Sequence, residues 1–214
     1  MIRVKICGMT DRADIEACVA AGADALGFIF AKSPRRLALD EARTLTATVP
    51  PFVTTVGVFA GDSAELVSGA IEACRLDVLQ FSGDETAEFC GSFGKPTVVA
   101  SRGNRWSAAD RARARAIAVL VDAWSPNGFG GTGRLVPLET AQRARVDHEG
   151  AAIVLAGGLT PSNVGPLIRS VKPDAVDVRT GVEKASRKDP ELVRAFVAAA
   201  RSAFDSHDDK EGGS

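Results

Sequence analysis

The sequence predicts a single-domain α/β protein, an eight-stranded parallel (β/α)8 barrel of the TIM type, on three observations. Eight short apolar runs rich in β-branched residues recur along the 214 residues. Amphipathic stretches separate these runs, so that strands and helices alternate throughout. The composition does not shift along the chain, and the length is at the short end for one such barrel. We therefore expect a barrel domain over residues 1–205 and a polar, disordered tail over residues 206–214.

The predicted strands are nearly continuous apolar runs, as expected for strands that are buried on both faces. In chain order they cover residues 4–6, 25–30, 53–59, 78–80, 97–100, 118–121, 152–155 and 175–178. An open doubly wound sheet usually has fewer strands, which favours the closed barrel.

The helices are predicted from amphipathic stretches between the strands, several of which open on typical helix-start residues. Asp11 and Arg12 are interpreted as the opening of the first helix rather than as substrate contacts. The clearest helical stretches cover residues 11–21, 39–48, 63–74, 161–171 and 190–204.

The composition is that of a soluble globular protein, in which any anion must be held by a local site. Lysine and arginine number 26 against 27 acidic residues, and the net charge of −1 predicts neither a nucleic-acid nor a membrane partner. No apolar run approaches the length of a membrane span. The charged, strand-like start with Arg3 and Lys5 is unlike a signal peptide, so we expect a cytoplasmic protein. Nothing in the composition predicts an oligomeric state.

The cysteines and histidines do not form a metal-site or disulfide pattern. The four cysteines have neither CxxC spacing nor the density of a disulfide-stapled domain, so reduced thiols are expected. His148 and His207 are the only histidines, too few for a typical zinc site or a Ser/His/Asp triad. Any chemistry must therefore use other groups, and we interpret Cys18, Cys74 and Cys90 as small buried hydrophobic residues.

Glycine pairs follow the last two predicted strands, where barrels frequently bind a phosphate. A third glycine-rich loop after the sixth strand is predicted to close over the ligand as a lid. Any one of these loops, taken alone, is more simply an ordinary tight turn. Three on one face favour a phosphate site formed by Gly130, Gly131, Gly133, Gly157, Gly158, Thr180 and Gly181.

Cys7 ends the first strand on the same side as Lys5, so both side chains are predicted to point into the barrel. A cationic neighbour favours the thiolate. Because closure brings the eighth strand beside the first, we also expect Asp177 to pair with Lys5 and weaken this activation.

Asp122 follows the sixth strand and is predicted to lie at the barrel mouth, since the residues after it read as loop rather than as a helix to be capped. A thiolate and a carboxylic acid with separated pKa values form a base and an acid for proton transfer beside a carbonyl or imine. Arg35 and Arg36 follow the second strand, and a guanidinium there can bind a carboxylate, although solvation is the simpler interpretation of either arginine taken alone.

With these residues the chain resembles the phosphoribosylanthranilate isomerase family of tryptophan biosynthesis. The resemblance extends from residue 1 to about residue 203. The matching segments are Lys5-Ile6-Cys7-Gly8-Met9-Thr10, Asp122 with Gly130-Gly131-Thr132-Gly133, Ala156-Gly157-Gly158-Leu159-Thr160-Pro161-Ser162-Asn163-Val164, and Val176-Asp177-Val178 with Gly181-Val182-Glu183. The first and third segments together are highly specific.

The resemblance implies an Amadori rearrangement that converts N-(5-phosphoribosyl)anthranilate into 1-(2-carboxyphenylamino)-1-deoxyribulose 5-phosphate without metal or organic cofactor. It implies that Asp122 is the general acid and Cys7 the general base. It also implies that Arg36 binds the anthranilate carboxylate and that the glycine loops bind the phosphate.

The chain departs from the family pattern at three places. Ser82 replaces a histidine after the fourth strand, Arg179-Thr180 replaces two serines after the eighth, and Val136-Pro137-Leu138 replaces Phe-Asp-Trp after the lid. Two alternatives remain open. A related isomerase of histidine biosynthesis acts on a substrate with two phosphates, but the loops around Gly61 and Gly83 are weaker phosphate candidates. A catalytically silent phosphosugar-binding barrel is the other alternative, against which the presence of Cys7 and Asp122 argues.

Overall fold

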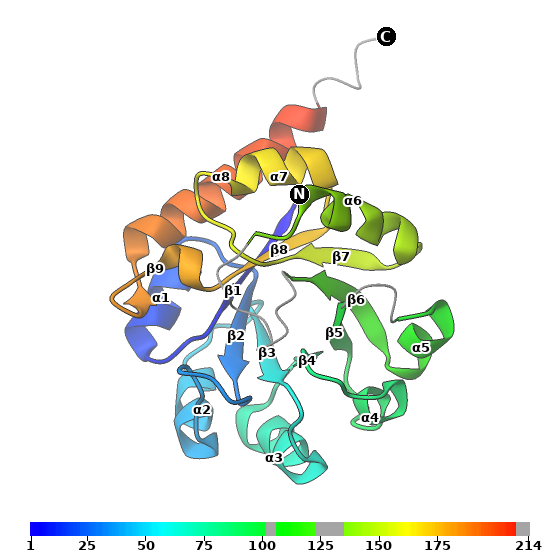
Figure 1. Cartoon of the computed structure of the whole chain (residues 1–214). Helices are drawn as coiled ribbons and strands as arrows, with labels where there is room; N and C mark the ends of the chain where they lie inside the picture. The colour runs from blue at the N-terminus through cyan, green and yellow to red at the C-terminus, as the bar shows by residue number, and fades with distance from the viewer. Residues whose placement is uncertain (102–105, 123–134, 209–214) are drawn as a thin grey trace.

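The computed structural model describes residues 1–101, 106–122 and 135–208, and it confirms the closed parallel barrel. The barrel strands pair in sequence order, and the last pairs with the first (Figure 1). They are β1 (Arg3–Cys7), β2 (Ala25–Ile29), β3 (Thr54–Phe59), β4 (Val78–Phe81), β5 (Thr97–Ser101), β6 (Ala116–Val121), β7 (Ala152–Leu155) and β8 (Ala175–Val178). Each predicted strand is present, with ends that differ by two residues at most.

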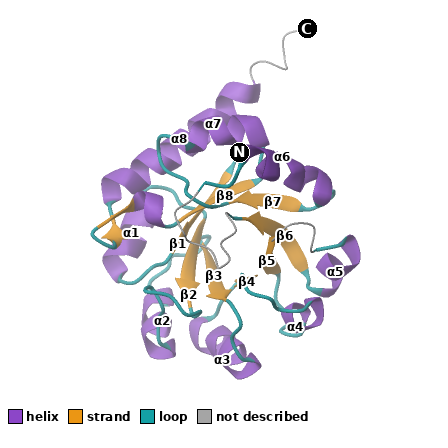
Figure 2. Ribbon diagram, in the orientation of Figure 1, coloured by secondary structure: helices purple, strands orange, loops and turns teal. Residues whose placement is uncertain are grey.

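The helices form an outer ring around the strands (Figure 2). Asp11 caps the first helix by accepting a hydrogen bond from the Asp14 N–H, as predicted. The α-helices are α1 (Arg12–Ala20), α2 (Leu39–Thr46), α3 (Ala64–Cys74), α4 (Ala87–Gly91), α5 (Ala108–Arg113), α6 (Leu138–Asp147), α7 (Val164–Val171) and α8 (Pro190–Asp208).

The apolar core divides according to the faces of the strands. In β6, Val119 and Val121 pack in the large cluster shared with the helices, whereas Ala118 and Leu120 belong to a separate cluster on the other face. Successive side chains of a strand point to opposite faces, so this second cluster fills the barrel interior. The interior is therefore packed, and ligands have access only at its ends.

A row of aromatic rings fixes the ends of β2, β3 and β4. Phe30 stacks on Phe59 with ring centroids 5.1 Å apart, and Phe59 lies 5.9 Å from Phe81. All three rings are buried. This packing sets the starting positions of the loops that follow β3 and β4.

One excursion after β8 was not predicted. It comprises the 3-10 turn η1 (Thr180–Val182) and a hairpin of β9 (Glu183–Lys184) and β10 (Arg187–Lys188). Ala185 and Ser186 join the two short strands with positive φ angles, a conformation that usually selects asparagine or glycine. The sequence therefore lacks the usual signal for this turn. α8 continues to Asp208, and in the described part of the chain no helix is long and apolar enough to cross a membrane.

Candidate active site

Cys7 is the last residue of β1 and lies at the carboxyl ends of the barrel strands. Its side chain is buried and packs in a small cluster with Ile29 and Val58. A Cβ atom on Gly27, in the neighbouring strand, would lie only 2.7 Å from the Cys7 Sγ. Glycine at position 27 therefore provides the space that the thiol occupies.

The electrostatic surroundings of Cys7 agree with the predicted pairing of its neighbours. Lys5 Nζ donates to Asp177 Oδ2 at 2.9 Å, and both side chains are buried. Burial raises the pKa of the Cys7 thiol, while the positive charges of Lys5, Lys188 and Arg179 oppose this rise. The Asp177 carboxylate adds to it, as expected from its pairing with Lys5.

Lys188 joins the end of β1 to the excursion after β8. Its Nζ donates to the Cys7 carbonyl oxygen at 2.6 Å, to the Arg179 carbonyl oxygen at 3.1 Å and to Glu183 Oε1 at 2.8 Å. Arg35 completes the network by donating to Glu183 Oε2 at 2.6 Å. Despite partial burial, these two cations lower the pKa of Glu183.

Sequence reasoning missed this network. Lys188 and Glu183 lie among charged residues that read as surface, and Arg35 is far away in the sequence. The only available signal was Glu183 at the end of a family-like segment. A buried lysine that holds the Cys7 backbone has a positioning role.

The loop after β7, which the sequence predicted to bind phosphate, has two successive glycines in the left-handed region. Gly157 and Gly158 both have positive φ angles, 82° and 62°. Asn163 shapes the loop, since its Oδ1 accepts from the Thr160 N–H at 2.8 Å and its Nδ2 donates to the Gly158 carbonyl at 3.0 Å. Within the described residues, neither glycine donates its N–H to a protein acceptor.

The loop after β8 lies directly against the loop after β7. A Cβ atom on Gly181 would collide with the Leu159 carbonyl oxygen, so that only glycine fits. Thr180, which precedes it in η1, is exposed. The structure thus brings together the two loops that the sequence predicted to bind phosphate.

The other predicted site residues fall into two groups. Asp122 directly follows β6 and is half-buried, and Arg36 follows β2 and is exposed, whereas its neighbour Arg35 is engaged with Glu183. The predicted lid residues Gly130, Gly131 and Gly133 lie outside the described residues.

The departures from the family pattern also have positions in the structure. Ser82 accepts a hydrogen bond from Gln80 Nε2 at 3.1 Å. Arg179 is half-buried, and its methylene groups lie against Gly8, 3.4 Å from where a Cβ would stand. Pro137 takes the N-cap position of α6, next to Leu138.

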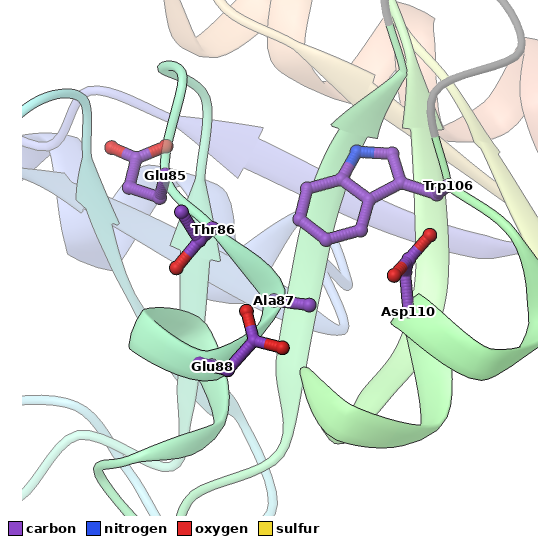
Figure 3. Close-up of a pocket in the computed structure, with 6 residues that line it drawn as sticks. All are labelled: Glu85, Thr86, Ala87, Glu88, Trp106 and Asp110. Carbon is purple, nitrogen blue, oxygen red and sulfur yellow. The ribbon is translucent and has the colours of Figure 1, made fainter.

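A cavity of about 240 Å³ lies elsewhere, between the starts of α4 and α5 (Figure 3). None of its lining residues was predicted to take part in the chemistry. They are Glu85, Thr86, Ala87, Glu88, Trp106 and Asp110.

Comparison with known proteins decides the family. The model of the family "N-(5'phosphoribosyl)anthranilate (PRA) isomerase" matches residues 4–199. The chain belongs to this isomerase family. The matched range includes Cys7, Asp122 and the loops after β7 and β8.

Relatives with this family name match along nearly the whole chain. The N-(5'-phosphoribosyl)anthranilate isomerase of Trichlorobacter lovleyi is 45% identical over 207 residues, which cover 95% of this chain and 100% of the relative. That of Moorella thermoacetica is 42% identical over 211 residues, 97% of this chain and 93% of the relative.

Solved structures of the family share the fold. The phosphoribosyl anthranilate isomerase of Thermus thermophilus superimposes with a TM-score of 0.81 at 35% identity, covering 94% of this chain and 99% of its own. Another isomerase structure, solved with reduced 1-(o-carboxyphenylamino)-1-deoxyribulose 5-phosphate, has a TM-score of 0.77 at 31% identity and covers 94% and 100%.

Proposed function

We propose that this chain catalyses the Amadori rearrangement of N-(5'-phosphoribosyl)anthranilate, with Asp122 as general acid and Cys7 as general base. One observation carries the proposal. In a chain of this isomerase family, Cys7, Asp122 and the glycine loops all follow the carboxyl ends of barrel strands, where the active sites of this fold lie.

Asp122 gives its proton to the furanose ring oxygen as the bond between that oxygen and C1 breaks. The nitrogen lone pair forms the iminium. Cys7 then takes the proton from C2, and the electrons of that C–H bond neutralise the iminium to give an enolamine. The enolamine gains a proton at C1 and its C2 hydroxyl loses one, which yields the ketone. Atoms balance, as an isomerisation requires.

The surroundings of Cys7 suit a base that acts on a cationic intermediate. Burial raises the pKa of the thiol, so that the thiolate, once formed, accepts a proton strongly. Lys5, Lys188 and Arg179 oppose this rise. An iminium held beside Cys7 adds a further positive charge at the step in which the proton leaves C2.

Two anchors support the orientation of the substrate. The backbone N–H groups of Gly157 and Gly158 are donors for the phosphate, with Thr180 and Gly181 in the adjoining turn. The exposed Arg36 guanidinium is a donor for the anthranilate carboxylate. Gly130, Gly131 and Gly133 are proposed to contribute to the same phosphate site.

The experiment is the loss of anthranilate fluorescence when the purified chain meets freshly generated N-(5'-phosphoribosyl)anthranilate. Cys7→Ser and Asp122→Asn are each expected to lower kcat by about 10²- to 10⁴-fold, the usual contribution of a general acid or base. Cys74→Ala and Asp40→Asn, away from the site, are the matched controls and are expected to keep native turnover. A native chain that binds the substrate without turning it over would contradict the proposal.

A further inference from the structure

The loops after β3 and β4 repeat the backbone layout of the loops after β7 and β8. Gly61 lies two residues past β3, as Gly157 lies two residues past β7. Both have positive φ angles, 73° and 82°. Gly83 and Thr180 likewise lie two residues past β4 and β8. Strands four places apart in a closed eight-stranded barrel are related by half a turn, so the barrel has a second potential anion position opposite the first.

A carboxylate already occupies the second position. Glu85 Oε1 accepts from the Gly61 N–H at 2.6 Å, and Glu85 Oε2 accepts from the Gly83 N–H at 2.9 Å. The neighbouring Ala60 N–H is also taken, by Asp62 Oδ2 at 2.9 Å. Two oxygens of one buried anion thus bind the N–H groups that an incoming phosphate would need.

The fit around Glu85 is tight. A Cβ atom on Gly83 would lie 2.7 Å from Glu85 Oε1 and 2.8 Å from the Gly61 nitrogen. A phosphate cannot enter beside the carboxylate without displacing it. The cavity in Figure 3 does not offer a phosphate another place, because the carboxylates of Glu88 and Asp110 also line it. The Glu85 carboxylate lies on the side of this cavity opposite Trp106 and Asp110.

We propose that the Glu85 carboxylate occupies the anion position opposite the phosphate loops and thereby restricts the site to substrates with a single phosphate. The proposal rests on the proposed function for the orientation of the substrate, with its phosphate at Gly157 and Gly158. A second phosphate at the other end of a substrate meets occupied donors and a like charge. Glu85 is therefore a specificity determinant for the reaction.

The experiment follows backbone amide resonances of the ¹⁵N-labelled full chain during titration with inorganic phosphate. In the native chain we expect shifts at Gly157 and Gly158 and none at Gly61 and Gly83. In Glu85→Ala both pairs are expected to shift. Phosphate binding at the second position should become at least about tenfold tighter, since a charge-assisted acceptor no longer competes.

Two further variants keep the test decisive. Glu88→Ala removes an exposed carboxylate from the same segment and is expected to behave as the native chain does. Glu85→Gln removes the charge but keeps the size, and it serves if the alanine variant does not fold. In that case shifts at Gly61 and Gly83 are expected in the glutamine variant.

The results that would overturn the proposal are distinct from failure of the proposed function. A response of Gly61 and Gly83 in the native chain would overturn the proposal about Glu85. The absence of that response in every folded Glu85 variant would also overturn it. Silence at Gly157 and Gly158 in the native chain would instead contradict the phosphate site of the proposed function, while the resonances of Gly61 and Gly83 would still report on Glu85.

Discussion

The two halves of the barrel mouth place glycines at matching positions after the strands, but they differ in which groups accept hydrogen bonds from the glycine N–H groups. After β7, the N–H groups of Gly157 and Gly158 have no protein acceptor within the described residues. After β3 and β4, the N–H groups of Gly61 and Gly83 are bound by the Glu85 carboxylate. The fold alone therefore does not decide how many anions the site accepts. We attribute the difference in the number of anions accepted to one buried side chain, Glu85.

The half that holds the proposed phosphate loops also holds Cys7, the proposed general base, within a network of buried charges. Lys188 connects the excursion after β8 with the carbonyl group of Cys7, and Lys5 pairs with Asp177 across the seam between β1 and β8. In this half, buried charges position a reactive group. In the other half, a buried charge satisfies the backbone and excludes ligands.

The largest expected effect on stability comes from Lys188, whose side chain is fully buried. Lys188→Met leaves the Cys7 and Arg179 carbonyl groups without their donor and Glu183 with Arg35 alone. Removing one partner of a buried ionic network typically costs about 3 kcal/mol of unfolding free energy. Urea unfolding measures the change. Lys184→Met, which breaks the ion pair of the exposed Lys184 with Asp189, should cost much less unfolding free energy. Equal losses would contradict the bracing role.

Gly181→Ala tests the packing of the two proposed phosphate loops directly. The added Cβ collides with the Leu159 carbonyl oxygen, so the loops after β7 and β8 must separate. We expect KM for phosphoribosylanthranilate to rise about 10- to 100-fold, the equivalent of one charge-assisted hydrogen bond. Steady-state kinetics measures this rise. The control is Gly69→Ala in α3, where the Cβ meets Leu39 at an ordinary 3.5 Å, and KM should not change.

Arg36→Ala separates recognition of the carboxylate from recognition of the phosphate. The loss of a guanidinium contact should raise KM for the substrate about tenfold. Inhibition by inorganic phosphate should stay at the native level, because Arg36 follows β2 and not the phosphate loops. If phosphate inhibition weakens equally, Arg36 belongs to the phosphate half instead.

The smallest expected effect is a shift in the titration of Cys7. The Asp177 carboxylate raises the pKa of the Cys7 thiol, so Asp177→Asn should lower it and increase the thiolate fraction at a given pH. The rate of alkylation of Cys7 by iodoacetamide, followed by peptide mass against pH, should reach half its maximum at a lower pH. Cys18 does not interfere, because burial raises its pKa to about 12. An unchanged midpoint would contradict the role of Asp177.

The barrel was predictable because its signals are local. Each strand is a continuous apolar run, and the strand ends mark where Cys7, Asp122 and the glycine loops must lie. The pairing of Lys5 with Asp177 also followed, since barrel closure fixes which strands are neighbours. Base, acid and phosphate-binding chemistry followed from the positions of these residues at strand ends, whereas the specific reaction came from resemblance to the family; the residue roles stay proposals.

The remaining features depend on contacts that no local pattern encodes. Lys188 and Glu183 occur in a charged stretch that reads as solvent-exposed, yet packing buries both. Glu85 reads as an ordinary acidic residue before a helix. Its role becomes visible only when the ends of β3 and β4 are adjacent and two N–H groups converge on its carboxylate.

A crystal structure of this chain with reduced 1-(o-carboxyphenylamino)-1-deoxyribulose 5-phosphate tests the central claim most directly. We expect the phosphate on the N–H groups of Gly157, Gly158 and Gly181, the sugar C2 beside the Cys7 Sγ, and the carboxylate on Arg36. We also expect Glu85 to keep both of its N–H donors. A phosphate bound at Gly61 and Gly83, with Glu85 displaced, would contradict both the proposed orientation of the substrate and the proposed role of Glu85.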